Sequence, residues 1–264
     1  MKFDIIADQA IALVRETGEL VRREREKLLG RGIISKGKND FVTQVDKAAE
    51  EHLAKGLSQI LPGCGFIAEE GTVGQYPSEY VWIIDPIDGT TNFIHGAPPY
   101  SISVGLMVKN ALAGGIVYEI TADECFYAFK GGKAYLNGGE IKVSSTPNVK
   151  DALLATGFPY TEFSRMEAYM QTMQYFFHNS HGVRRLGSAA ADLAYVACGR
   201  YDGFYEYDLK PYDVAAGAFI IEAAGGRVTD FKGGNDFLFG KEIVAGNSLL
   251  FDELQSVIGS FLNK

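Results

Sequence analysis

The sequence has few cysteines and no long apolar run, and each shortage excludes a class of protein. Three of its 264 residues are cysteine, an odd number, with no CxxC motif and no histidine at zinc-ligand spacing. This pattern argues against a disulfide framework or a zinc site and favours reduced, buried thiols. The longest apolar stretch, residues 214–221, is far too short to cross a bilayer, and two early aspartates interrupt any signal region. We therefore expect a cytoplasmic protein.

Positive charge is also in short supply. Lys and Arg total 25 against 33 for Asp and Glu, which gives a formal net charge of −8. Nucleic acid and anionic membranes attract a basic excess, so neither is expected as a partner. Hydrophobic residues make up 47% and charged residues 22% of the chain. Such a composition is typical of a globular protein, and the length allows one large domain or two closely packed ones.

The first 60 residues predict two helices separated by a loop. Apolar residues recur at three and four over residues 3–28, which predicts a long amphipathic helix. Residues 30–40 are rich in Gly and Lys without periodicity, so we expect a mobile loop there. Thr43 and Asp46 have the spacing of a capping box, and a second helix should follow over residues 44–60.

The pattern of expected secondary structure changes near residue 146. Before it, short β-type runs predict a largely antiparallel sheet, with strands at residues 65–68, 81–84, 101–108, 113–118, 124–129 and 140–143. After it, strands alternate with helices, which predicts an α/β half. The expected strands there are 153–155, 183–186, 203–205, 227–229 and 243–245, and the expected helices are 162–178, 189–198, 211–224 and 249–262. We therefore expect two units, residues 1–146 and 147–264.

The most informative segment is an apolar strand that stops at two acids. Residues 81–84 lead into Asp85, Pro86, Ile87, Asp88 and Gly89. Two carboxylates held at a strand end repel one another unless a cation lies between them, which favours a divalent metal with oxygen ligands. Residues 89–91 can open a short helix whose free N–H groups would bind phosphate. The alternative is an ordinary turn built on Asp-Pro and Asp-Gly pairs.

Other phosphate machinery is missing from the sequence. It has no GxxxxGK[ST] loop, no cysteine followed six residues later by arginine, and no GxSxG motif. The positions after Asp85 also fail the EF-hand pattern. Without an obvious nucleophile, attack by metal-activated water is favoured.

Two further acidic features lie where such a site would need them. Glu69 and Glu70 follow the expected strand 65–68, and Asp213 lies in the first turn of a helix opened by Pro211. Glu69 is a candidate metal bridge, although a solvated strand end is the common reading of such a pair. Asp213 also has a structural alternative, because an acid in a first turn complements the helix dipole.

Together these segments resemble the inositol monophosphatase family. The resemblance rests on the acidic pair at 69–70, DPIDGTTN at 85–92, LGSAAADLAYVACGRYDGFYE at 186–206, PYDVAAG at 211–217 and EAAGG at 222–226. It covers essentially the whole chain. It implies a lithium-sensitive, Mg²⁺-dependent phosphomonoesterase that acts on a small phosphorylated polyol. It also implies an α/β fold layered as an αβαβα sandwich, and a homodimer.

The resemblance also implies roles for individual residues. Glu69, Asp85 and the Ile87 carbonyl would hold one magnesium, and Asp88 with Asp213 would complete a second site that shares Asp85. Glu69 would also help to hold a weak third ion. The phosphate would lie on Gly89 and Thr90, and the polyol against Asp88, Gly187, Ser188, Ala189, Glu206 and Asp213.

The attacking water is the last part of this site. Asp46 and Thr90, with Glu69 and its metal, resemble the family residues that position and deprotonate the water. Asp46 has a second reading, because the capping box alone would explain an acid at that position.

The family resemblance leaves the substrate open. Inositol monophosphate is the first choice, because Thr91-Asn92-Phe93 after the acidic motif resembles that branch. Fructose 1,6-bisphosphate and bisphosphorylated nucleotides remain alternatives, and Arg184-Arg185 could meet a second phosphate. Tyr212 departs from the family, where tryptophan is usual before the aspartate. A non-catalytic regulatory protein on the same fold is the alternative of another class.

Overall fold

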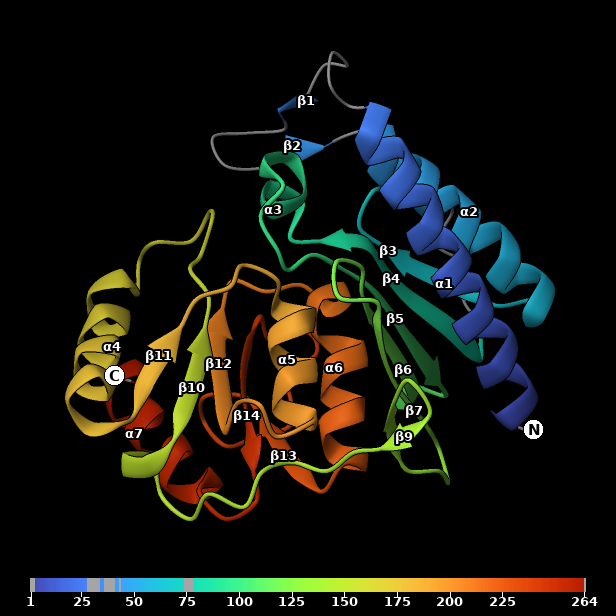
Figure 1. Cartoon of the computed structure of the whole chain (residues 1–264). Helices are drawn as coiled ribbons and strands as arrows, with labels where there is room; N and C mark the ends of the chain where they lie inside the picture. The colour runs from blue at the N-terminus through green and yellow to red at the C-terminus, as the bar shows by residue number, and fades with distance from the viewer. Residues whose placement is uncertain (1–2, 28–33, 36–40, 43, 74–77, 264) are drawn as a thin grey trace.

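The chain folds into alternating layers of helices and sheets (Figure 1). The computed structural model describes residues 3–27, 34–35, 41–42, 44–73 and 78–263. Its helices are α1 (Phe3–Lys27), α2 (Gln44–Ile60), α3 (Thr90–His95), α4 (Met166–Asn179), α5 (Ala189–Ala197), α6 (Pro211–Ala223), α7 (Phe251–Leu262) and the 3₁₀ helix η1 (Val149–Asp151). The longer ones agree with the helices expected from apolar periodicity, with shifts of a few residues at their ends.

Among the described residues, the larger sheet has seven strands. In spatial order these are β3 (Gly65–Ala68), β4 (Tyr80–Asp88), β5 (Ser101–Val108), β6 (Ala111–Glu119), β7 (Glu124–Phe129), β8 (Ala134–Leu136) and β9 (Gly139–Glu140). Only the β3–β4 pair is parallel, and the other neighbours are antiparallel. The prediction of a largely antiparallel N-terminal sheet is therefore confirmed.

The smaller sheet is mixed and belongs to the C-terminal half. Its order in the described chain is β11 (Gly182–Arg184), β10 (Leu153–Thr156), β12 (Gly203–Tyr207), β14 (Glu242–Asn247) and β13 (Gly226–Thr229). β10 runs parallel to both β11 and β12, whereas β14 is antiparallel to β12 and β13. Strands that alternate with helices produce this arrangement, as the sequence texture predicts.

Two expected strands differ from the structure. The strand predicted at residues 140–143 is wrong, because the described chain has the short hairpin of β8 and β9 there instead, with Asn137 and Gly138 in left-handed conformation at its turn. β4 does not stop at Ile84 but continues through Asp88, paired with β5 on both sides of an irregularity. The chain pairs wherever a neighbouring edge is available, so apolar content alone misjudges where a strand ends.

The N-terminal loop is described only in part. Ile34–Ser35 (β1) and Phe41–Val42 (β2) form a two-residue antiparallel pair. The remainder of the loop expected at residues 30–40 lies outside the described residues, and so does Thr43 of the expected capping box.

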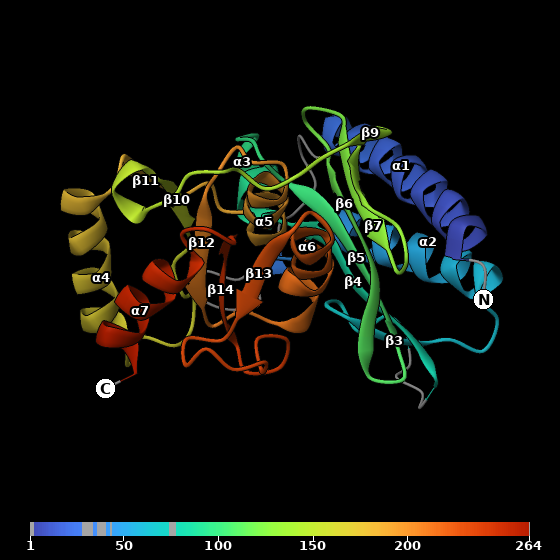
Figure 2. The ribbon, with the colours of Figure 1, turned by 90° about the horizontal axis from the view of Figure 1, so that it is seen from below.

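Five layers result from this packing (Figure 2). α1 and α2 cover the outer face of the seven-stranded sheet, α5 and α6 lie between the two sheets, and α4 and α7 cover the outer face of the five-stranded sheet. The αβαβα sandwich is therefore confirmed. The central helices bury alanines, and one core cluster joins Val117 and Phe126 of the first sheet to Leu193 of α5 and Ala245 of β14.

The boundary expected at residue 146 falls in the connection between β9 and η1. The division into units 1–146 and 147–264 stays a prediction. Within the described chain, no helix combines the length and apolar character needed to cross a membrane.

Candidate active site

A bulge in β4 brings two of the predicted acids to one side of the sheet. Asp85 pairs with Ser103 and Asp88 with Ser101, so three steps along β4 match two along β5. Pro86, which lies within this irregularity, has no N–H to give to the ladder. Residues three apart on a regular strand point to opposite faces, and the extra residue of a bulge cancels that alternation. The Ile87 N–H donates to Asp85 Oδ1 at 2.9 Å and holds that carboxylate in place.

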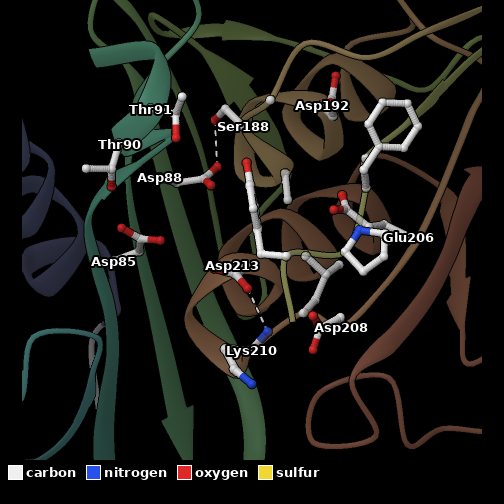
Figure 3. Close-up of a pocket in the computed structure, with 18 of the residues that line it drawn as sticks. Asp85, Asp88, Thr90, Thr91, Ser188, Asp192, Glu206, Asp208, Lys210 and Asp213 are labelled. Carbon is white, nitrogen blue, oxygen red and sulfur yellow. Dashed lines mark hydrogen bonds between the residues drawn. The ribbon is translucent and has the colours of Figure 1, made fainter. Parts of the chain in front are cut away.

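α6 delivers the third acid to the same space. Pro211 opens this helix, and the Lys210 N–H donates to Asp213 Oδ2 at 2.6 Å across the first turn. Asp85, Asp88 and Asp213 each offer a carboxylate oxygen, and these oxygens lie within 4.8 Å of one another. Figure 3 shows the three carboxylates turned toward a common centre. Asp213 follows Asp88 by more than a hundred residues in the sequence, yet the three acids form one cluster of oxygen donors.

Glu69 joins this cluster from β3. β3 lies parallel to β4, and the Glu69 N–H donates to the Ile84 carbonyl at 3.3 Å, next to Asp85. Glu69 Oε2 is buried and has no hydrogen-bond partner among the described residues. Asp46 is buried in the first turn of α2, and its charge acts on Glu69. The positions of Glu69 and Asp46 fit the roles that the family resemblance implies.

Burial and mutual repulsion raise the pKa values of these acids. Burial raises the pKa of Asp88 to about 6, against hydrogen bonds that lower it. Burial and the charge of Asp88 raise the pKa of Asp213 to about 7. The pKa values of Glu69 and Asp85 lie well above the ordinary range because burial and neighbouring carboxylates disfavour ionisation. A divalent cation would offset this repulsion, and an all-oxygen donor set is the one that Mg²⁺ prefers, so these residues fit the expected metal.

The segment after Asp88 is the one where the phosphate is predicted to lie. Gly89 precedes α3 with a φ of 91°, in the left-handed region, and a Cβ there would lie 3.0 Å from the Gly187 carbonyl. Glycine therefore allows both the turn and the close approach. The Thr90 hydroxyl donates to the Ile87 carbonyl at 3.0 Å. Because the Thr90 O–H is the donor in this bond, the Thr90 oxygen can still accept a hydrogen bond, for example from a water molecule.

The start of α5 forms the opposite wall. Ser188 caps this helix, its hydroxyl accepting the Ala191 N–H, and it also donates to Asp88 Oδ2 at 2.6 Å. The Ala190 N–H donates to the same oxygen at 2.7 Å. Asp88 therefore belongs both to the acidic cluster and to the wall where the polyol is expected. Glu206, near the end of β12, is also buried and lines the same pocket.

A cavity of about 210 Å³ joins these groups. It is lined by the predicted residues Glu69, Asp85, Ile87, Asp88, Gly89, Thr90, Gly187, Ser188, Ala189, Glu206 and Asp213. Of the predicted site residues, Asp46 does not line it. Asp46 is buried in the first turn of α2, and its charge acts on Glu69, which does line the cavity.

The cavity is also lined by residues that the sequence did not predict. Phe158, Tyr160, Asp192 and Asp208 all line it. The guanidinium carbon of Arg185 lies 5.3 Å from the centre of the Phe158 ring, and an Arg185 N–H donates to the Tyr160 hydroxyl at 3.1 Å. Asp192 Oδ1 is buried with no hydrogen-bond partner in the described chain. One signal was available for Asp192, because it is the single charged residue in the otherwise apolar helix α5. No local pattern marked Phe158 or Tyr160.

Comparisons with known proteins agree with this fold and identify the family. Residues 4–259 match the inositol monophosphatase family. A Pseudomonas aeruginosa protein named Nus factor SuhB is 39% identical over 254 residues, 94% of each chain. An inositol-1-monophosphatase from Mesorhizobium japonicum is 37% identical over 236 residues, 89% of each chain. The solved extragenic suppressor protein suhB of Bartonella henselae has a TM-score of 0.91 and 35% identity, covering 96% of this chain and 98% of that one. The chain belongs to the inositol monophosphatase family.

Proposed function

We propose that this protein is a Mg²⁺-dependent phosphatase that hydrolyses an inositol monophosphate to inositol and phosphate. The observation that carries the proposal is the cluster of Asp85, Asp88 and Asp213, whose carboxylate oxygens lie within 4.8 Å of one another in a pocket. Family membership and the relative named inositol-1-monophosphatase support it.

The acids would hold magnesium in the way that the family resemblance implies. Glu69, Asp85 and the Ile87 carbonyl would form one site, with Asp88 and Asp213 completing a second and Glu69 also helping a weak third. What magnesium supplies at such a site is positive charge, which screens the phosphate and lowers the pKa of a nearby water molecule.

The chain's own groups would orient the reactants. Thr90 donates to the Ile87 carbonyl, so its oxygen can accept a hydrogen bond from the attacking water. Asp46, with Glu69 beside the cluster, would take up the proton of that water. The N–H groups around Gly89 and Thr90 would receive the phosphate oxygens at the start of α3.

The polyol would lie between α5 and β12. Gly187, Ser188 and Ala189 at the start of α5 and Glu206 of β12 all line the cavity. Hydroxyl and carboxylate groups suit the hydroxyls of a sugar-like ring, because a hydroxyl can donate or accept a hydrogen bond and an ionised carboxylate can accept one. Asp88 and Asp213 would contact both the metal and the leaving side of the substrate.

The test is phosphate release from a panel of substrates. The panel contains inositol 1-phosphate, fructose 1,6-bisphosphate, adenosine 3′,5′-bisphosphate and histidinol phosphate, each assayed with Mg²⁺, with added Li⁺ and with EDTA. We expect preference for inositol 1-phosphate, inhibition by Li⁺, and no turnover in EDTA. Preference for a bisphosphate would move the protein to a sister activity on the same cluster of acids.

One observation favours a bisphosphate as the second candidate. Arg185 also lines the cavity, and its Nε is buried with no hydrogen-bond partner among the described residues. A guanidinium in that position could receive a second phosphate. Fructose 1,6-bisphosphate and adenosine 3′,5′-bisphosphate in the panel test this directly.

A regulatory role is the alternative of another class. The Pseudomonas relative is named a Nus factor, and a family fold can serve without catalysis. The complete set of acids in this chain argues for catalysis instead. Absence of turnover on every substrate would favour the regulatory role.

We also propose that the protein forms a homodimer in the cytoplasm. Size-exclusion chromatography with light scattering tests the oligomeric state, and we expect twice the chain mass of 28.8 kDa. A mass equal to one chain would contradict it.

A further inference from the structure

A second buried acid on α2 lies outside the cavity and contacts the segment that carries Glu69. Glu50 has no exposed surface. Its Oε2 accepts the Glu70 N–H at 2.7 Å, and its Oε1 accepts the Thr72 N–H at 2.8 Å and the Thr72 hydroxyl at 2.6 Å. All three donors belong to the turn that follows Glu69.

These bonds account for the burial of the charge. An isolated carboxylate is costly to remove from water, whereas one that accepts several N–H and O–H bonds is stabilised. An apolar side chain would fill the same space without that requirement. The carboxylate of Glu50 therefore has a specific task, which is to hold the backbone of residues 70–72.

That backbone determines where Glu69 lies. β3 ends at Ala68, and the Glu69 N–H makes the last bond to β4, a long one of 3.3 Å to the Ile84 carbonyl. Beyond this point Glu50 supplies the bonds to Glu70 and Thr72. The Glu69 carboxylate shares a side-chain hydrogen bond with Asp85, a neighbouring acid, but its Oε2 has no hydrogen-bond partner in the described chain. Its placement depends on the two backbone anchors on either side.

We propose that Glu50 is a positioning residue that holds Glu69 in the metal site and so sets the affinity for Mg²⁺. The inference rests on the proposed function of the acidic cluster. α2 then serves the site twice, because Glu50 follows Asp46 by one helical turn on the same buried face. One helix presents the acid expected to act on water and also clamps the loop of a metal ligand.

The substitution Glu50→Gln tests the clamp. The glutamine amide has the same volume as the glutamate carboxylate. Its NH₂ group, however, would face an N–H or O–H donor of residues 70–72 where the Glu50 oxygen accepts a hydrogen bond. Residues that support a metal ligand typically contribute 10- to 100-fold to metal affinity. We expect calorimetric titration of EDTA-stripped protein to give a Mg²⁺ dissociation constant raised by about 10- to 100-fold. The kcat at saturating Mg²⁺ should stay close to that of the unmodified protein.

Two further variants make the result specific. Glu51→Gln changes the adjacent, exposed glutamate of α2 and should leave Mg²⁺ binding unchanged. Thr72→Val removes only the hydroxyl donor and should weaken Mg²⁺ binding about two- to tenfold. Because this hydroxyl acts through Glu50, the double variant should bind no more weakly than Glu50→Gln alone.

The outcomes separate this inference from the proposed function. If Glu50→Gln lowers the melting temperature but binds Mg²⁺ normally, Glu50 is only structural and the inference is overturned. If Glu50→Gln does not fold, normal Mg²⁺ binding by Thr72→Val overturns it instead. If the unmodified protein binds no Mg²⁺ at all, the proposed metal site fails and this inference fails with it.

Discussion

Asp85 lies at the centre of the acidic cluster, and its environment opposes its own charge. Burial and the nearby carboxylates of Glu69 and Asp88 raise its pKa. Asparagine at this position has the same shape, and its Oδ1 can still accept the Ile87 N–H. The fold should therefore tolerate the change, while the proposed metal site loses a ligand.

We predict that Asp85→Asn lowers Mg²⁺-dependent kcat/KM by about 10²-fold or more, comparable with removal of a group that stabilises charge in a transition state. The melting temperature of the metal-free protein should not fall. The control is Asp151→Asn, which removes an exposed carboxylate in η1. Phosphate release and thermal unfolding measure both quantities, and full activity of Asp85→Asn would refute the metal assignment.

The same acids predict how stability depends on pH. The pKa values of Asp88 and Asp213 rise from 3.8 to about 6 and about 7 on folding. Between these values the unfolded chain has already released the protons that the folded chain still holds, so rising pH favours the unfolded state. The free energy of unfolding of the metal-free protein should therefore fall as pH rises from 3.8 to about 7.

Urea unfolding over this pH range with EDTA measures the effect, and Asp213→Asn isolates it. The variant lacks one titrating group, so its stability should fall less steeply with pH. Saturating Mg²⁺ should reverse the trend, because metal binding competes with protonation of the ligands. A variant with an unchanged slope would contradict this prediction.

At the scale of elements, a close approach between α6 and β6 positions Asp213. Gly115 of β6 faces the α6 backbone, and a Cβ there would lie 2.4 Å from the Ala216 carbonyl oxygen. The backbone of Ala216 cannot rotate away from an added methyl group, whereas the end of a flexible side chain could. Glycine at this point lets the helix lie directly on the sheet.

We predict that Gly115→Ala destabilises the fold by about 1–3 kcal/mol, as expected for overpacking. The shift of α6 should also weaken Mg²⁺ binding through Asp213. Gly139→Ala is the matched control, because its Cβ would have only the Leu136 carbonyl nearby, at 3.4 Å. Urea unfolding tests the first effect, and an unaltered midpoint for Gly115→Ala would disprove the close contact.

After β10, Gly157 faces a side chain rather than backbone. A Cβ on Gly157 would lie 2.0 Å from Glu206 Oε1, which is the end of a flexible side chain. We predict that Gly157→Ala displaces this carboxylate and raises the KM for the polyol substrate on the order of tenfold, the equivalent of one lost hydrogen bond. Stability should change little. Steady-state kinetics measure the KM, and a rise in Gly139→Ala as well would remove the specificity of the result.

At the scale of the whole molecule, the central helices join the two sheets. The core cluster around α5 and α6 contains residues of both sheets, among them Val117, Phe126 and Ala245. Unfolding one sheet would expose the apolar faces of these helices to water. We predict a single cooperative unfolding transition, with calorimetric and van't Hoff enthalpies that agree. Two separate transitions in scanning calorimetry would contradict this and would support independent units divided near residue 146.

Much of the fold was predictable from local patterns. The period of apolar residues identified α1, α2 and α7, and short β-type runs identified β3, β5 and β7. Both signals record which face of an element is buried, and that information repeats every few residues along the chain. The acids of the site could be named for a related reason, because Asp85 and Asp88 lie in one compact motif with a glycine.

Only the tertiary structure decided how these pieces meet. The bulge that places Asp85 and Asp88 on one side of β4 depends on pairing with β5, and the clamp of Glu50 on Glu70 joins residues twenty positions apart. The cavity likewise brings Asp192 and Phe158, which are distant in sequence, into one lining. The sequence by itself determined the family, the main elements and which acidic residues are the candidate ligands. The distances among those ligands follow from packing between distant segments, which local periodicity does not record.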